Sequence, residues 1–259
     1  MKHNYLMISG HNEKHLNKIS SVDGIVMLNL EDGVPQDKKQ FALENIIKFL
    51  KNNNLNKKII VRINDLKTTG LEEIKKLNNF NISFRIPKIE TIKELNKIFE
   101  ITDKDIYLSI ETKQAFFDLK SFNHNQIKGF YLGILDLFDD LKLSHELIKI
   151  DNDFIKKILI DFSLDCLYLD KIGVGFVYQQ YKDLKGFKNW CELQKDFGLK
   201  GVGCITPNQL KIANEVFEDK NLEYAKMIVK RFESEGPFTI DGLYVDEPIY
   251  KNYKLKIKS

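Results

Sequence analysis

The sequence predicts one (β/α)8 barrel, and three observations support that prediction. Eight short runs of apolar, β-branched or aromatic residues recur along the chain. Most neighbouring runs are separated by charged segments whose apolar residues have helical spacing, which is typical of repeated βα units. The length of 259 residues also matches the roughly 250 residues that this fold usually takes. Because the runs are continuous rather than alternating, they favour a parallel sheet covered on both faces.

The expected strands, in order, cover residues 5–9, 24–30, 58–63, 82–87, 105–110, 127–134, 165–170 and 200–205. Between them, the clearest helical patterns lie at 38–50, 91–101 and 187–198. We assign the barrel to about residues 1–220 and an additional C-terminal helix and tail to about 221–259, all within a single domain, because no Gly- or Pro-rich linker divides the chain. A doubly wound open sheet is the alternative arrangement of the same elements.

Composition and charge argue against several classes of protein. The net charge is +3, from 40 basic and 37 acidic residues, and the lysines are spread over helix-like stretches. This pattern indicates solvated faces rather than a nucleic-acid surface. Three cysteines without metal-ligand spacing favour a reducing, cytoplasmic setting. No run approaches the roughly 18 to 20 apolar residues of a membrane span, and the N-terminus does not resemble a signal peptide.

Charged residues gather where the expected strands stop. In a barrel the carboxyl ends of the strands form one rim, and barrel enzymes carry out their chemistry there. The residues at these ends are Glu31, Asp32, Arg62, Asn64, Pro87, Lys88, Glu90, Glu111 and Asp136. For any one of these acids, capping of the following helix or a plain turn is a sufficient explanation. Several carboxylates at one rim repel each other unless a cation lies among them, and Mg2+ suits oxygen ligands of this kind.

Eight segments, in order, resemble the citrate lyase beta subunit branch of the HpcH/HpaI aldolase superfamily, whose relatives include malyl-CoA and citramalyl-CoA lyases. They are NYLMISGH at 4–11, MLNLEDGVP at 27–35, VRIN at 61–64, RIPKIE at 85–90, IET at 110–112, LGILDL at 132–137, ITPNQ at 205–209 and DGLYVDEPI at 241–249. The resemblance covers nearly the whole chain.

This resemblance implies a Mg2+-dependent retro-aldol or retro-Claisen lyase that assembles as a homotrimer or hexamer. It implies Glu111 and Asp136 as metal ligands. The catalytic residues that it implies are Arg62, Glu31, Asp32 and Asp246, with Asp241 as the rival of Asp246 and with Asp246 reaching a neighbouring subunit in several relatives. The substrate-binding residues that it implies are Arg62, Asn64, Lys88, Gly133 and Thr206.

The sequence departs from the family pattern where relatives bind coenzyme A. His3 stands where relatives usually have arginine, and Val202 and Thr206 stand at the usual lysine and histidine of the eighth strand's loop. Losing cationic groups there weakens the case for a phosphate-rich substrate. We therefore expect lyase chemistry on a small hydroxy or keto acid, with the use of a CoA or acyl-carrier thioester left open. Mn2+ is an equally acceptable metal.

Two other functions compete with the thioester lyase. One is an aldolase that uses free 2-keto acids without CoA. The other is a catalytically silent barrel that keeps its metal site and serves as a scaffold subunit. The joint presence of Arg62, Glu111, Asp136 and Asp246 favours an enzyme, because a silent scaffold has no chemical need for all four.

Overall fold

The computed structural model describes residues 3–53, 55–218 and 221–258, which form two compact units. The first unit ends at Phe217 and the second begins at Glu218. Whether the two units form the single domain expected from the sequence depends on how they associate, so the single domain stays a prediction.

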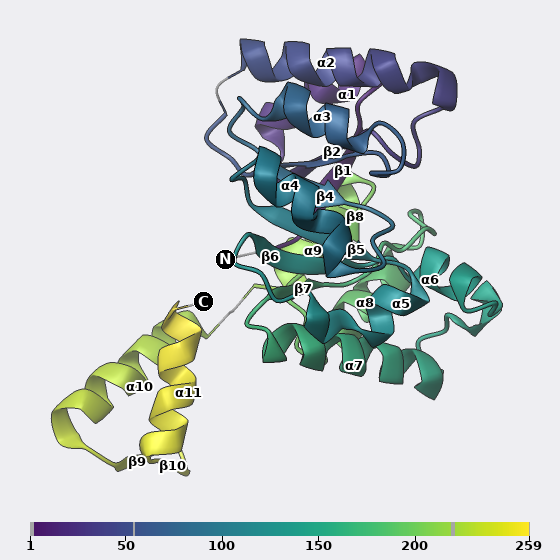
Figure 1. Ribbon diagram of the computed structural model, residues 1–259. Helices are drawn as coiled ribbons and strands as arrows, with labels where there is room; N and C mark the ends of the chain where they lie inside the picture. Colours follow the sequence, from purple (N-terminus) through teal and green to yellow (C-terminus); the bar gives the residue numbers. More distant parts are fainter. Residues whose placement is uncertain (1–2, 54, 219–220, 259) are drawn as a thin grey trace. The chain divides into compact units, whose positions relative to one another are not determined.

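The first unit is a barrel of eight parallel strands (Figure 1). The strands are β1 (Tyr5–Ser9), β2 (Ile25–Asn29), β3 (Ile59–Arg62), β4 (Ser83–Ile86), β5 (Ile106–Ile110), β6 (Ile127–Leu132), β7 (Ile172–Val174) and β8 (Gly203–Cys204). Their order is β7-β6-β5-β4-β3-β2-β1-β8. The predicted TIM-barrel fold is confirmed, and the open-sheet alternative is excluded.

Short backbone contacts close the barrel between β7 and β8. Gly175 N donates to Gly201 O at 2.8 Å, and Lys200 N donates to Gly173 O at 2.9 Å. A parallel bridge joins Val177 to Gly203. This seam is more irregular than the ladders that join the other strands.

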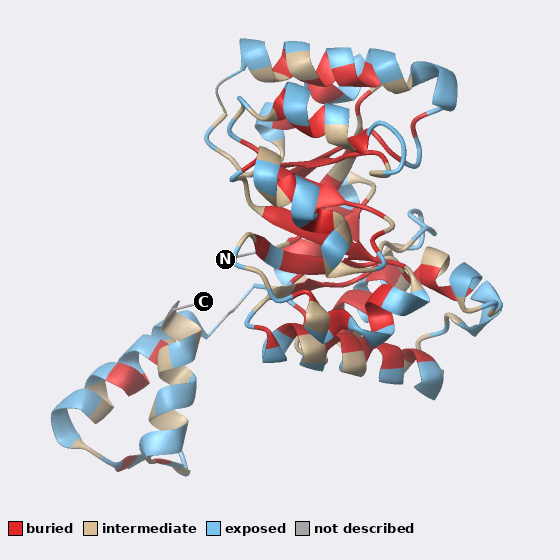
Figure 2. Ribbon diagram, viewed as in Figure 1, coloured by how far each residue is buried: buried red, intermediate tan, exposed pale blue. Residues whose placement is uncertain are grey.

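Helices cover the outside of the barrel and turn their apolar faces inward (Figure 2). They are α1 (Glu13–Leu16), α2 (Lys39–Asn52), α3 (Gly70–Leu77), α4 (Asn96–Ile101), α5 (Lys113–Phe117), α6 (Ile134–Asp140), α7 (Asp153–Tyr168), α8 (Leu184–Asp196) and α9 (Pro207–Val216), with short 3-10 segments at Ile19–Ser21, Gln36–Lys38, Ile92–Leu95, Leu119–Ser121 and His145–Leu147. In α2 the buried positions Ala42, Ile46 and Phe49 repeat at the spacing of one helix face. Among the described residues, no helix combines the length and the apolar character needed to cross a membrane.

The predicted seventh strand at 165–170 is wrong. These residues form the end of α7 and the turn after it, and the strand follows at Ile172–Val174. A short apolar run does not distinguish strand from buried helix by periodicity. Within α7 Cys166 is buried whereas Tyr168 is exposed. The true strand, IGV, has only three residues and contains Gly173, so its apolar run is too short to stand out in the sequence.

Two apolar layers hold the barrel together. The larger lies between the strands and the helices. The smaller fills the barrel interior and contains Tyr5, Ile25, Met27, Ile60, Tyr107, Tyr131 and Val174. Two of its rings, Tyr107 and Tyr131, meet edge to face at 5.6 Å between centroids. This layer supports the rim from below.

The C-terminal unit is a helix, a β-hairpin and a second helix: α10 (Leu222–Glu235), β9 (Phe238–Ile240), β10 (Leu243–Val245) and α11 (Glu247–Lys258). The hairpin turns at Asp241 and Gly242, both with positive φ (47° and 79°), as a type I′ turn requires. Ile228, Phe238 and Val245 form its own small core. The predicted C-terminal helix is confirmed as α10, and the expected tail contains a hairpin and a further helix.

Candidate functional site

Four charged side chains meet at the carboxyl ends of β2, β3 and β5. Arg62 ends β3, Glu31 and Asp32 follow β2, and Glu111 follows β5. Arg62 Nη2 lies 2.8 Å from Glu31 Oε2, 3.5 Å from Asp32 Oδ2 and 3.6 Å from Glu111 Oε2. Parallel strands place their carboxyl ends at one rim, so residues far apart in sequence form one cluster.

Arg62 is the buried counter-ion of this cluster. Its side chain is 8% exposed, and those of Glu31 and Glu111 are 3% and 1% exposed. Burial alone would lower the pKa of Arg62, but the charges of Glu111, Glu31 and Asp32 raise it above its usual value. Arginine therefore supplies a fixed positive charge here at any working pH.

The two neighbouring acids differ in their affinity for a proton. Burial alone would raise the pKa of Glu31, but the Arg62 guanidinium and hydrogen bonds from Asp32 and Lys88 lower it to about 2. Asp32 has a raised pKa because of its partial burial and because of the hydrogen bond and negative charge of Glu31. Glu31 is thus a fixed anion, and Asp32 takes up a proton more readily.

The free energy of unfolding is expected to decrease as the pH is lowered, partly because of Glu31. A carboxyl group whose pKa is depressed in the fold stabilises it above the unfolded pKa, and that contribution is lost as pH falls through the folded pKa. For Glu31 the window runs from 4.5 down to about 2, and the shift corresponds to at most about 3 kcal/mol. Asp32 acts in the opposite direction, so the net loss is smaller.

Denaturant unfolding of wild type and Glu31→Gln across this window tests the expectation. The variant is expected to be less stable at neutral pH, and the two stability curves should approach each other below pH 4.5 and converge only near pH 2. Parallel curves over the whole range would contradict the assignment.

Lys88 links two of the acids through its backbone and its side chain. Its N–H donates to Glu111 Oε1 at 2.7 Å, and its Nζ lies 2.9 Å from Glu31 Oε1. The residue adopts φ of 53°, a left-handed conformation that costs a non-glycine residue about 1–2 kcal/mol. In this conformation the backbone N–H of Lys88 orients the carboxylate of Glu111. The ammonium group of the same residue neutralises the carboxylate of Glu31.

Gly133 leaves room for Glu111. A Cβ atom at this position would lie 2.6 Å from Glu111 Cβ and 2.8 Å from Glu111 Oε2. Contacts this short force a displacement. The glycine therefore fixes where the carboxylate lies, which is a steric role distinct from the substrate contact expected of it.

Gly133→Ala is expected to weaken divalent-cation binding about 10-fold or more, since residues that orient a metal ligand typically have effects of this size. The added methyl group displaces Glu111 Oε2. Calorimetric titration with Mg2+ gives the affinity, and the thermal midpoint reports whether the fold is kept. An affinity equal to that of wild type would show that the carboxylate moves without consequence.

A cavity of about 510 Å3 opens beside the cluster, and Asp32, Arg62, Glu111, Gly133 and Asp136 are among its lining residues. Asp136 lies in the first turn of α6, not in the turn considered from sequence. Asp136 adds to the effect of burial in raising the pKa of Glu111, whereas Arg62 and Arg85 oppose it.

The donor set fits a hard divalent cation. Glu111 Oε2 is buried without a hydrogen-bond partner, and it faces the additional negative charge of Asp136. Mg2+ uses one or two protein carboxylates and fills its other positions with water or substrate. Across the described residues, no three His, Cys, Asp or Glu side chains form a ready-made metal cage.

Other predicted residues have local structural partners. Asn64 is buried and donates through its backbone N and its Nδ2 to Glu73, at 2.8 and 2.6 Å. Thr206 caps α9, with its hydroxyl accepting from Gln209 N. Val202, at the position of the expected lysine, is fully buried. The substrate contacts expected of Asn64 and Thr206 stay predictions.

Asp246 lies in the C-terminal unit, so the structure does not place it relative to the rim. Its Oδ1 accepts from Ile249 N at 3.1 Å at the start of α11. Its rival Asp241 is a turn residue of the hairpin. Asp246 thus lies at the start of a helix and Asp241 in a turn. The catalytic role of Asp246 stays a prediction.

Arg85 and His145 are among the cavity residues that sequence reasoning missed. Arg85 lies within the RIPKIE segment, on the inner face of β4, where an arginine in an otherwise apolar strand was the available signal. His145 Nε2 lies 2.9 Å from Asp139 Oδ1. This pairing depends on the loop after α6 and left no pattern in the sequence.

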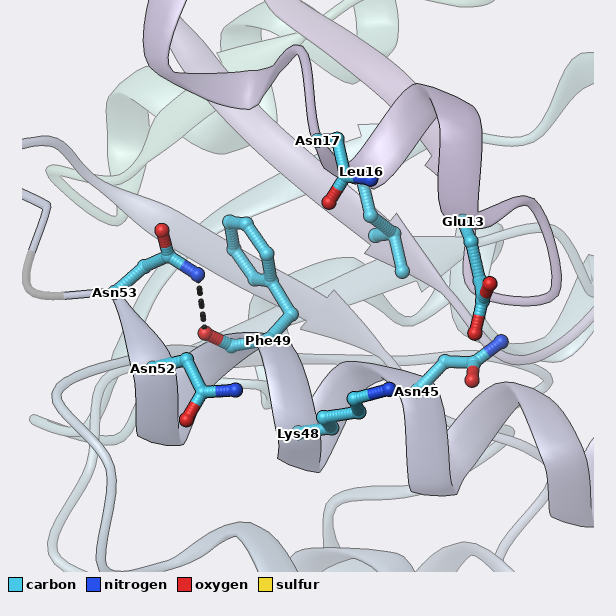
Figure 3. A pocket seen from close by; sticks show the side chains of 8 residues that line it. All are labelled: Glu13, Leu16, Asn17, Asn45, Lys48, Phe49, Asn52 and Asn53. Carbon is cyan, nitrogen blue, oxygen red and sulfur yellow. Dashed lines mark hydrogen bonds between the residues drawn. The ribbon is translucent and has the colours of Figure 1, made fainter.

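A second hollow lies outside the barrel, between α1 and α2 (Figure 3). Its volume is about 140 Å3, and it is lined by Glu13, Leu16, Asn17, Asn45, Lys48, Phe49, Asn52 and Asn53. Asn45 and Asn53 already donate to the backbone oxygens of Gly10 and Phe49. The hollow contains none of the expected site residues.

Fold and rim together define a TIM-barrel protein with an arginine-centred carboxylate site at the strand ends. The chain belongs to the HpcH/HpaI aldolase/citrate lyase family, whose model matches residues 5–207. Among curated proteins it is similar to (3S)-malyl-CoA thioesterase of Cereibacter sphaeroides (strain ATCC 17025 / ATH 2.4.3). The two are 26% identical over 269 residues, covering 93% of this chain and 88% of the relative.

Solved structures share the fold. Protein CitE from Mycobacterium tuberculosis, in complex with magnesium, acetoacetate and coenzyme A, aligns with a TM-score of 0.81 and 19% identity over 99% of this chain and 97% of that one. A citrate lyase from Burkholderia xenovorans LB400 aligns with a TM-score of 0.83 and 15% identity over 100% and 91%.

Proposed function

We propose that this protein is a Mg2+-dependent carbon–carbon lyase that cleaves a small 2-hydroxy acid, or its thioester, and releases a 2-keto acid. The observation that carries the proposal is Glu111 Oε2, which is buried without a hydrogen bond and lies 3.6 Å from Arg62 Nη2, in a cavity that Asp136 and Arg62 also line. Magnesium, acetoacetate and oxaloacetate are bound in solved structures of similar fold. Family membership adds support for an enzyme.

Glu111 and Asp136 would hold the cation, which supplies a Lewis acid for the carboxylate and the adjacent oxygen of the acid. Arg62 contributes a second positive group, because it lines the same cavity. Hydrogen bonds aimed at a developing enolate oxygen lower the barrier to its formation. Glu31, held ionised, and Lys88 keep Arg62 and Glu111 in place.

A carboxylate removes the hydroxyl proton, and the O–H electrons form the carbonyl of the 2-keto acid. The carbon–carbon bond breaks, and its electrons pass into the enolate, which takes up a proton to become the second product. Two carboxylates are candidates for this base. Asp32 lines the cavity and has a raised pKa, and Asp246 is the residue that the family resemblance implies.

A thioesterase is the second candidate, because the curated relatives are named (3S)-malyl-CoA thioesterase. That reaction adds water to the thioester carbonyl and releases free coenzyme A. The same carboxylates would activate the water. Val202, which is buried, and Thr206, which caps α9, stand where relatives have a lysine and a histidine. Two cationic contacts to coenzyme A are therefore missing, so free acids are included as substrates in the test.

The test incubates the purified protein and Mg2+ with malyl-CoA, citramalyl-CoA and the corresponding free acids, and identifies products by mass spectrometry. A keto acid with an acyl-CoA or acetate product supports the lyase. A hydroxy acid with free coenzyme A supports the thioesterase. Turnover of none of the four would favour the silent scaffold, and turnover that survives metal chelation would contradict the role of the carboxylates.

Oligomeric state and compartment are part of the proposal. The family resemblance implies a trimer or hexamer, which light scattering of the purified protein measures. The three cysteines are buried and free, as the proposed cytoplasmic setting requires.

A further inference from the structure

Arg85 is a buried cation in the wall of the cavity. It lies on β4 in register with Arg62 on β3 and Tyr107 on β5. The residue is 4% exposed, yet it lines the same cavity as Arg62 and Glu111. An arginine inside a barrel otherwise filled by apolar and tyrosine side chains requires an explanation.

Neutral groups orient its guanidinium. Nε donates to Ser109 Oγ at 2.8 Å, and Nη1 donates to Tyr5 Oη at 3.0 Å. The Tyr131 ring lies below it, with 4.5 Å from Arg85 Cζ to the ring centroid. These contacts fix the plane of the guanidinium without neutralising its charge.

No carboxylate of the described residues forms an ion pair with Arg85 within 4.0 Å. The nearby acids are already engaged: Glu31 with Arg62 and Lys88, and Glu111 with Arg62 and the backbone of Lys88. A buried cation without a paired anion is costly. The missing anion is then expected to come from a ligand.

The remaining nitrogen of Arg85 is available for such a ligand. Within the described part of the chain, Nη2 has no hydrogen-bond acceptor. It is also absent from the buried polar atoms that lack a partner, so this nitrogen is not sealed inside the protein. Arg85 lines the cavity, and Nη2 is its one nitrogen without an acceptor among the described residues.

We propose that Arg85 binds the second carboxylate of a dicarboxylic substrate, so that the cavity selects 2-hydroxy and 2-keto dicarboxylic acids over monocarboxylic ones. The inference rests on the proposed function, in which Glu111 and Asp136 engage the first carboxylate through the metal. Arg85 thus determines specificity rather than the chemical step. Arginine suits this role because its planar fork matches a carboxylate.

Malate and lactate form a matched pair of stable ligands for the test. Both carry a 2-hydroxy acid group, and they differ mainly in the second carboxylate. Oxalate is the reference ligand, because it occupies a divalent cation and is too short to extend further. Calorimetric titration of Mg2+-loaded wild type is expected to show malate binding about 10- to 100-fold more tightly than lactate, the range of a charge-assisted hydrogen bond.

Arg85→Met is expected to bind malate and lactate about equally while oxalate affinity stays within about twofold of wild type. Ser109→Ala, which loosens the same layer but keeps the charge, should retain a preference for malate. If Arg85→Met loses oxalate binding through misfolding, Arg85→Gln replaces it.

Equal malate and lactate affinities in wild type, or an unchanged preference in Arg85→Met or Arg85→Gln, would overturn the inference alone. Failure of oxalate to bind wild type in a Mg2+-dependent way would instead overturn the proposed function, and the inference with it.

Discussion

Arg62→Met is expected to abolish turnover and to lower the free energy of unfolding by about 3–5 kcal/mol at neutral pH. The substitution leaves Glu31 and Glu111 buried without the cation that lies 2.8 and 3.6 Å from them. Removing one partner of a buried ion pair costs far more than removing an exposed one. Denaturant unfolding and product formation measure the two effects.

The pH dependence of this variant distinguishes lost charge from lost packing. Arg62 lowers the pKa of both Glu31 and Glu111, so both pKa values rise in Arg62→Met. Groups with a raised folded pKa destabilise the fold as pH rises through it. The stability deficit should therefore be large at neutral pH and shrink in acid.

Arg231→Met is the matched control. Arg231 is partly exposed, pairs with Glu235 at 3.0 Å and covers the Phe238 ring, so its loss should cost about 1 kcal/mol or less. A similar small cost for Arg62→Met at neutral pH would contradict the buried-counter-ion assignment.

Glu111→Gln is expected to lower the affinity for Mg2+ by at least about 100-fold and to remove activity while leaving the fold intact. The amide is close to the carboxylate in shape, and its oxygen still accepts from Lys88 N. Because burial raises the pKa of Glu111, its ionised form is unfavourable in the fold above that pKa. Stability at neutral pH should therefore be equal to or greater than that of wild type.

Glu73→Gln is the control, and it is expected to change stability without changing Mg2+ affinity. Glu73 is buried and accepts from Asn64 N, Asn64 Nδ2 and Thr69 Oγ1, away from the lining of the cavity. Its substitution should lower stability and leave Mg2+ affinity unchanged. Wild-type Mg2+ affinity in Glu111→Gln would remove Glu111 from the metal site.

Seven of the eight strands were predictable because each is a continuous apolar run ended by a polar residue, as in the run before Glu31. The seventh was not, because β7 has three residues and the end of α7 imitates a strand. Register made the cluster of Glu31, Arg62 and Glu111 predictable, since strand ends share a rim. The steric role of Gly133 and the orientation of Arg85 could not be predicted, because both depend on contacts with side chains from other strands.

We expect the barrel to open at the least free-energy cost at the seam between β7 and β8. Local opening follows the density of hydrogen bonds and buried contacts, and here a three-residue and a two-residue strand meet through glycine-rich backbone. The amides of β2 to β5 are then the slowest to exchange with solvent. Water entering at this seam would first meet the barrel interior that Val174 and Tyr131 help to fill, so we expect the interior to hydrate from the flank before the rim unfolds.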